Sequence, residues 1–193
     1  MANFKMAYII TLGHEGGYDN DPDDVGGETY KGVSRKYYPN WEGWVLVDDW
    51  KRNSKFPEIM YKDPVLNDLI KNFYKENYWN LFWGDEIPDQ LIANELFDTG
   101  VNMGIGRAVK YLQKGLNLLN RNQKNYPDIV EDGAFGSNTI KALNSYLDID
   151  DNSFLLKIMN ILQGMHYIEY MTKSPIQEKY ARGWLSRVSI IKD

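Results

Sequence analysis

The residues best suited to chemistry stand in one short stretch near the start of the chain. Glu15 follows a segment with helical apolar spacing, Phe4 to Leu12, and precedes two glycines that favour a helix end. Asp24 stands nine residues after Glu15, and Thr29 follows five residues further on. A carboxyl group at a helix end, facing a polar loop with a second carboxylate, has the chemistry that hydrolysis of a glycosidic bond needs. Glu15 is therefore the candidate acid.

Each of these residues also has a plainer interpretation. In this interpretation Glu15 is a solvated charge at the end of a helix. The C-terminal end of a helix is partly negative, however, and disfavours a carboxylate. Asp24 belongs to a cluster of aspartates around Pro22, and turns use aspartates for backbone hydrogen bonds. Asp19 and Asp21 therefore compete with Asp24 for the role of second carboxylate. The cluster lacks the position-twelve glutamate of an EF-hand, so we expect no calcium, and the reaction needs neither metal nor cofactor.

Composition narrows the class of protein. The 193 residues suit one compact domain or two small, closely packed ones. The net charge of −5 argues against a nucleic-acid partner, and the absence of cysteine excludes disulfides and thiolate metal sites. No apolar run reaches transmembrane length, so we expect no stable membrane insertion. We also recognise no signal peptide, and so expect synthesis in the cytoplasm followed by export to the cell wall.

Hydrophobic spacing predicts a mainly α fold with a small irregular or β element near the first motif. Residues 18–34 are predicted to form a glycine- and aspartate-rich loop with a short hairpin, and Val45 to Val47 a short strand. Asp63 and Pro64 predict a helix start. Two further helices are expected over residues 105–119 and 151–165. Others are expected to begin at Pro88, after Ser137 as the N-cap, and after Pro175.

Several motifs resemble glycoside hydrolase family 108, whose members are lysozyme-like N-acetylmuramidases, some described as secretion activator proteins. The resemblance begins in the first motif and continues through the chain to its last helix. The matching residues are Glu15 to Tyr18, Asp24, Gly26-Gly27, Thr29, Gly32 to Ser34, Tyr78-Trp79, Phe97 to Gly104, Asp132 to Thr139 and Gly183 to Val188. Three features depart from the family pattern. Glu28 stands where a small residue or proline is usual, and the order of Tyr30 and Lys31 is exchanged. The tryptophan-rich stretch 40–57 carries no recognisable family feature.

The resemblance implies a lysozyme-like catalytic region over residues 1–90 and a peptidoglycan-binding helical region over 91–193, closely packed on the first. It implies that Glu15 is the general acid, that Asp24 orients or deprotonates the attacking water or stabilises oxocarbenium charge, and that Thr29 positions the water. Peptidoglycan glycan strands are the implied partner, with a holin or a secretion system for export.

Four further residues are predicted to contact the substrate. Asp98 and Asn102 are four residues apart and share a helix face, where they would hydrogen-bond N-acetyl groups. Helix capping or bonding between helices explains this pair equally well. Tyr18 and Tyr30 are predicted sugar-facing aromatics, although a single tyrosine more often belongs to the core or the rim of a site.

The sequence therefore predicts cleavage of the MurNAc–GlcNAc β-1,4 bond of peptidoglycan. Direct attack of water with inversion is the preferred stereochemistry, whereas carboxyl groups about 5 Å apart would favour retention. One alternative is a lytic transglycosylase, which uses one glutamate and would not need Asp24. The other is a non-catalytic peptidoglycan-binding protein that assists secretion or lysis.

Overall fold

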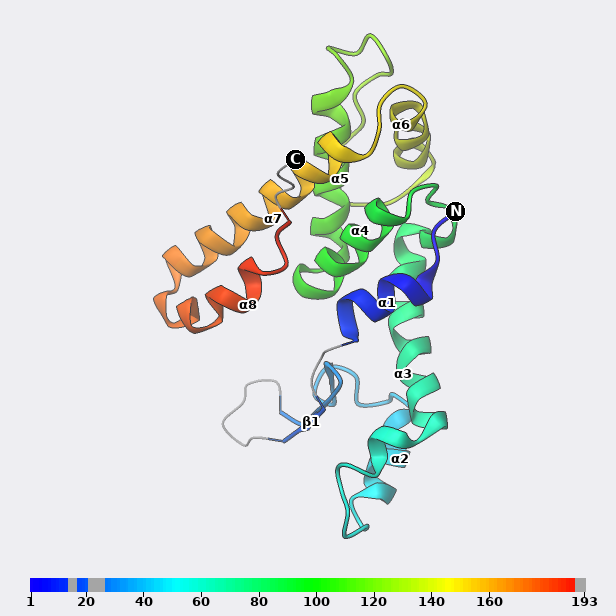
Figure 1. The fold of residues 1–193 in the computed structure, drawn as a ribbon, viewed down its shortest axis with the longest axis vertical. Coiled ribbons are helices and arrows are strands. Elements are labelled where there is room, and N and C mark those ends of the chain that lie inside the picture. Colours follow the sequence, from blue (N-terminus) through cyan, green and yellow to red (C-terminus); the bar gives the residue numbers. More distant parts are fainter. Residues whose placement is uncertain (14–16, 21–26, 190–193) are drawn as a thin grey trace. The chain divides into compact units, whose positions relative to one another are not determined.

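The computed structural model describes residues 1–13, 17–20 and 27–189 (Figure 1). In this part of the chain, eight α-helices dominate and the only sheet has three short strands. The predicted fold class, mainly α with a small β element, is confirmed. The chain forms two compact units, one over Tyr8–Asn77 and the other combining Met1–Ala7 with Tyr78–Asp193. The division near residue 90 stays a prediction.

The smaller unit holds the sheet, whose strands are β1 (Tyr18–Asp19), β2 (Thr29–Tyr30) and β3 (Val33–Ser34) in antiparallel order. Lys31 and Gly32 connect β2 to β3 with φ values of 44° and 80°. A two-residue hairpin turn of type I′ needs a positive φ at both central positions, which glycine adopts without strain. The Tyr74 hydroxyl donates to the Lys31 carbonyl over 2.8 Å and so ties this turn to helix α3.

Helix α3 (Pro64–Asn77) begins where the sequence predicts. The Asp63 carboxylate accepts hydrogen bonds from the backbone N–H groups of Val65 and Leu66, at 2.8 and 3.1 Å. This is the N-cap arrangement that satisfies the free N–H groups of a first turn. A 3-10 turn, η1 (Met60–Lys62), precedes the cap.

The predicted strand at Val45 to Val47 is wrong, because these residues lie inside helix α2 (Gly43–Trp50). Trp44 and Val47 are three residues apart and both are buried, whereas Val45 is exposed. This is helical spacing. The β-branched residues alone suggested a strand, but packing of α2 against α3 selects the helix.

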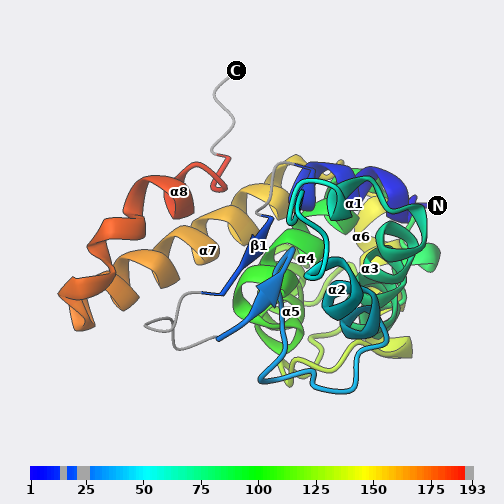
Figure 2. The ribbon, with the colours of Figure 1, turned by 90° about the horizontal axis from the view of Figure 1, so that it is seen from below.

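The larger unit is a helical assembly (Figures 1 and 2). Helix α5 (Ile105–Leu119) packs against α4 (Gln90–Met103) and α7 (Ser153–Lys173), and its position matches the predicted amphipathic segment. Gly115 lets α5 approach α7 closely, because a Cβ atom there would lie 2.6 Å from Leu155. Short 3-10 segments, η2 (Trp79–Phe82) and η3 (Gly84–Glu86), precede α4.

The chain start joins this larger unit through helix α1 (Phe4–Leu12). The Phe4 ring lies 5.6 Å from the Trp79 ring and 5.8 Å from the Phe97 ring. The Ala2 N–H group also donates to the Ile87 carbonyl over 2.8 Å. Aromatic packing thus anchors residues that are far apart in the sequence.

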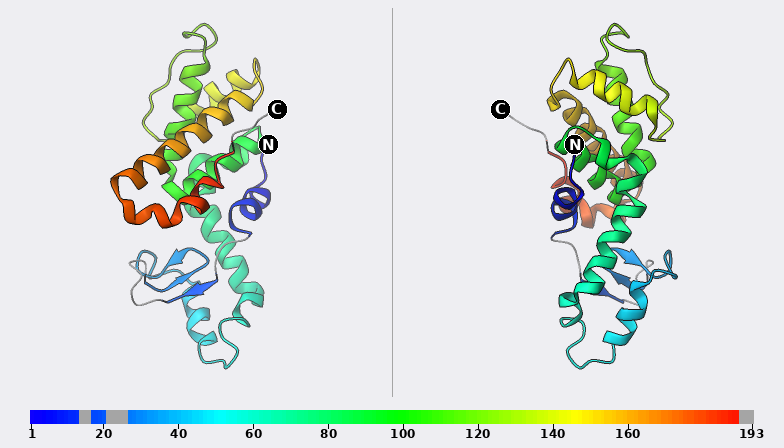
Figure 3. Two further views of the ribbon diagram at one scale, coloured as in Figure 1. Left: turned by 60° about the vertical axis from the view of Figure 1, so that its left-hand side comes forward. Right: turned by 90° about the vertical axis from the view of Figure 1, so that its right-hand side faces the viewer.

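Two predictions about helix ends need correction. Ser137 is the first residue of α6 (Ser137–Leu147) and does not cap it, because Gly136 occupies the cap position. The helix predicted after Pro175 is instead a 3-10 segment, η4 (Pro175–Tyr180), followed by the short helix α8 (Ala181–Leu185). Both segments fold back along α7, as Figures 2 and 3 show. Trp184 of α8 stacks on Tyr167 of α7, with ring centroids 5.3 Å apart, and this contact holds α8 against α7.

Candidate functional site

The sheet of the smaller unit carries three of the predicted site residues. Glu15 and Asp24 lie outside the described residues, Glu15 between α1 and β1 and Asp24 between β1 and β2. The register pairs Tyr18 with Tyr30, and Asp19 with Thr29. Directly paired residues share a face of an antiparallel sheet. Thr29 and Asp19 therefore lie on one face, and the two tyrosines lie on the other.

The two tyrosines differ in environment. Tyr30 is fully buried and stacks between the rings of Trp41 and Tyr61, at 6.2 and 6.4 Å. Burial raises the pKa of its hydroxyl well above the ordinary value. Tyr30 is thus part of the core of this unit, and its predicted contact with sugar stays a prediction.

Tyr18 is half-buried at the edge of the sheet. Its N–H group donates to the Tyr61 hydroxyl over 2.9 Å, and its ring meets the Phe56 ring edge-on at 4.7 Å. Burial, with a smaller effect of the hydrogen bond to Glu28, raises the pKa of the Tyr18 phenol. The phenol therefore stays protonated at neutral pH, and its single proton is donated to Glu28.

A network of four charged residues surrounds the start of β2. Glu28 forms ion pairs with Arg35 at 2.9 Å and with Lys51 at 2.7 Å. Arg35 also donates two hydrogen bonds to Asp48, at 2.7 and 3.0 Å, and Lys51 donates one at 2.9 Å. The bond from Arg35 is the main reason that the pKa of Asp48 falls to about 2. This network explains the unusual glutamate at position 28 as a link between the sheet and α2.

Asp98 and Asn102 belong to the larger unit. The Asp98 carboxylate accepts hydrogen bonds from Arg187 at 2.7 Å and from Gln163 of α7 at 3.3 Å. The Asn102 amide donates to the Asp98 carbonyl over 2.8 Å. The Asp98 contacts are bonds between elements, whereas the Asn102 contact stays within α4. The role of both residues in binding N-acetyl groups stays a prediction.

Sequence reasoning missed Glu95, which lies one turn before Asp98. One Glu95 carboxylate oxygen accepts from the Thr99 hydroxyl, and the other accepts from the Asn160 amide of α7, both over 3.1 Å. Burial raises the pKa of Glu95 to about 7. The sequence does hold one indication of this site. Glu95 stands among the apolar residues Ile92 and Leu96 of α4, where a charged side chain is unusual.

The motif from Asp132 to Thr139 folds around one buried glutamine. The Gln113 amide nitrogen lies 2.9 Å from the Asp132 carboxylate and 3.1 Å from the Ala134 carbonyl. The Gln113 oxygen accepts from the Gly133 N–H group over 2.9 Å, and Gly133 has a φ of 79°. The aspartate and the first glycine of this motif thus have a structural use in shaping the turn.

Comparison with known proteins identifies the family of the chain. Residues 8–104, which contain Glu15, Asp24 and Thr29, match the family model described as Glycosyl hydrolase 108. The chain belongs to this glycosyl hydrolase family. Residues 107–189 match a model described as Predicted Peptidoglycan domain. The two matches together support a role in hydrolysing or binding peptidoglycan, and therefore action at the cell wall.

The fold is similar to that of solved structures over nearly the whole chain. The structure of Brucella abortus SagA superposes with a TM-score of 0.62 and 22% sequence identity, covering 96% of this chain and 88% of that one. This likeness shows the fold. No curated protein sequence matches the chain. Among the described helices, none combines the length and the apolar character needed to span a membrane.

Proposed function

We propose that this protein hydrolyses the β-1,4 bond between MurNAc and GlcNAc in peptidoglycan, with Glu15 as the general acid. The observation that carries the proposal is that Glu15 lies within the glycosyl hydrolase 108 match, immediately after the chain leaves α1. Breaking the bond requires a proton on the departing oxygen, and a carboxyl group supplies it near neutral pH when its surroundings raise its pKa.

Asp24 is proposed as the second carboxylate, which orients or deprotonates the attacking water. Thr29 is proposed to help position that water. Two observations support the role of Thr29: it is half-exposed on β2, and its hydroxyl forms no hydrogen bond within the described residues. Tyr18 is proposed to contact the sugar with its aromatic ring at the edge of the same sheet. Inversion remains the preferred stereochemical outcome.

Mass spectrometry of digested peptidoglycan tests the proposal. We expect reducing MurNAc ends with the wild type and a loss of turnover of about 10²–10⁴-fold for Glu15→Gln, because the amide cannot donate the required proton. Binding to the wall should survive this substitution. Glu58→Gln is the matched control, because Glu58 is exposed in the same unit.

The other outcomes separate the alternatives. Anhydro-muramic ends would identify a lytic transglycosylase instead. If the wild type bound the wall but released no product, the hydrolase proposal would be wrong. The match of residues 107–189 to a peptidoglycan domain would then favour a binding protein.

A further inference from the structure

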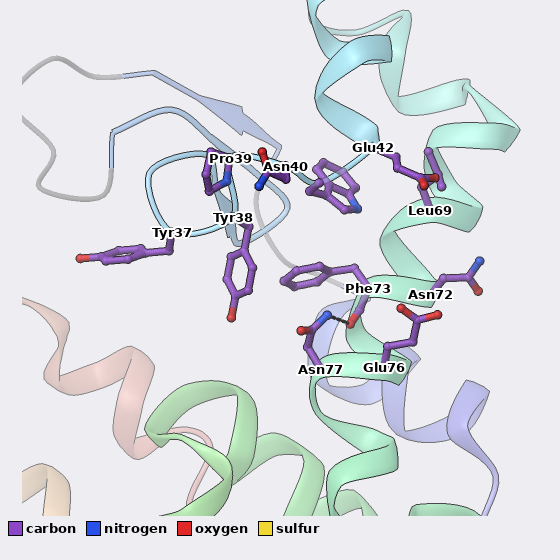
Figure 4. A pocket seen from close by; sticks show the side chains of 11 residues that line it. Tyr37, Tyr38, Pro39, Asn40, Glu42, Leu69, Asn72, Phe73, Glu76 and Asn77 are labelled. Carbon is purple, nitrogen blue, oxygen red and sulfur yellow. Dashed lines mark hydrogen bonds between the residues drawn. The ribbon is translucent and has the colours of Figure 1, made fainter.

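The loop before α2 and one face of α3 form a hollow in the smaller unit. Residues 37–42 and side chains of α3 line a space of about 480 Å³ (Figure 4). This volume falls within the range of roughly 300–1,000 Å³ that is typical of small-molecule sites. All the lining residues belong to the unit Tyr8–Asn77, and none is among the proposed catalytic residues.

The walls of this hollow are aromatic and held in place by packing. The Tyr38 ring meets the Phe73 ring edge-on at 4.7 Å, and Trp41 lies 6.2 Å from Phe73. The Trp44 indole donates to the Tyr38 carbonyl over 2.8 Å, which fixes the loop against α2. Tyr38 is exposed and Trp41 half-exposed, so both offer ring surface to a ligand. Rigid aromatic surfaces bind a flat apolar face at little cost in entropy.

Three polar side chains beside these walls are available to a ligand. Within the described residues, Asn40, Asn72 and Glu76 form no side-chain hydrogen bond or ion pair. Asn72 and Glu76 are four residues apart on α3, so they share one face of the helix (Figure 4). Amide groups both donate and accept hydrogen bonds, and carboxylates accept them from hydroxyl groups.

The charge of the hollow limits the ligand. All of its lining residues are described, and they include the carboxylates Glu42 and Glu76 but no lysine or arginine. Such a lining repels carboxylates, so among the units of a glycan strand it favours the one that carries no acidic group. Peptide stems and the lactyl group of MurNAc carry carboxyl groups, whereas an N-acetylglucosamine unit is neutral.

We propose that this hollow is a glycan subsite that binds a neutral N-acetylglucosamine unit without cleaving it. The apolar face of the sugar ring packs on Tyr38 and Trp41, and its hydroxyl and acetamido groups pair with Asn40, Asn72 and Glu76. The inference rests on the proposed function in one respect: the peptidoglycan strand is taken as the source of the sugar.

Titration of the full chain with chitotetraose, a neutral GlcNAc tetramer, tests the subsite by nuclear magnetic resonance. The Glu15→Gln background prevents cleavage. The side-chain amide signal of Asn72, assigned by its loss in Asn72→Ala, should shift and saturate. Removing one hydrogen-bonding group costs about 1 kcal/mol, so each of two substitutions should weaken binding roughly 5-fold. Glu76→Ala is followed at the Asn72 signal, and Asn72→Ala at the side-chain amide signal of Asn40.

Asn144→Ala is the matched control, because Asn144 is an exposed helical asparagine of the larger unit. An unmoved Asn72 signal, or equal weakening by Asn144→Ala, would overturn the subsite. Tighter binding of the anionic muramyl dipeptide at the same signal would overturn the assignment to a neutral sugar. Binding is measured here without turnover, so this result is independent of whether Glu15 cleaves peptidoglycan.

Discussion

At the scale of single residues, the proposed roles of the aspartates near Glu15 predict different effects of substitution. Four aspartates lie at positions 19, 21, 23 and 24, and only Asp19 is among the described residues. Asp19 is exposed at the end of β1 and pairs across the sheet with Thr29. Its place in the strand gives it a structural use that does not depend on catalysis.

Asp24→Asn should lower kcat/KM for peptidoglycan by about 100-fold or more, because a neutral amide neither deprotonates water nor stabilises positive charge. Asp19→Asn should retain activity within about 3-fold, on the same scale of catalytic effects. Release of soluble muropeptides measures both variants. An equal loss in Asp19→Asn, or full activity in Asp24→Asn, would contradict the assignment of the second carboxylate.

At the scale of elements, the charged network of Glu28, Arg35, Asp48 and Lys51 connects the sheet to α2. Glu28 has a side chain only 13% exposed and touches both cations. The Arg35 guanidinium also lies 4.5 Å from the centre of the Trp44 ring. A shared and partly buried network is stabilising where an isolated surface pair contributes little.

Glu28→Ala should therefore lower the free energy of unfolding by roughly 1–2 kcal/mol, because it leaves two partly buried cations with one carboxylate between them. Urea denaturation measures the change. Asp68→Ala is the control, since it removes an ion pair with Lys71 whose side chains are 73% and 51% exposed. If the two variants lost the same stability, the network would have no special role in holding the sheet.

At the scale of the whole molecule, Glu95 makes stability depend on pH. Its carboxyl group joins α4 to α7, and burial raises its pKa from 4.5 to about 7 in the folded chain. The unfolded chain releases this proton at a lower pH than the folded chain does. Stability is therefore lost as the pH rises from about 4.5 to about 7, and the penalty is constant above this window.

Glu95→Gln should remove this penalty while keeping a side chain of the same shape. The shift corresponds to roughly 3 kcal/mol, so the variant should gain about that much relative to the wild type between pH 4 and pH 8. Thermal unfolding at several pH values measures the gain. Glu86→Gln, at an exposed glutamate of the same unit, should show no such trend. A constant difference for Glu95→Gln across the pH range would show that the buried charge is not the cause.

The sequence alone determined the features that depend on neighbours along the chain. Apolar spacing placed the helices α3 and α5, and Asp63 with Pro64 marked a helix start, because helical periodicity and capping act within a few residues. The motif from Glu15 to Thr29 likewise indicated the family that the comparisons show.

The tertiary structure decided what depends on residues far apart in the sequence. Asp98 meets Arg187 across 89 positions, and the hollow brings Asn40 together with Asn72. The desolvation of Glu95, the burial of Tyr30 and the helical state of Val45 to Val47 also follow from packing. No local pattern encodes these contacts, because desolvation and ion pairing are set by the elements that pack around a side chain.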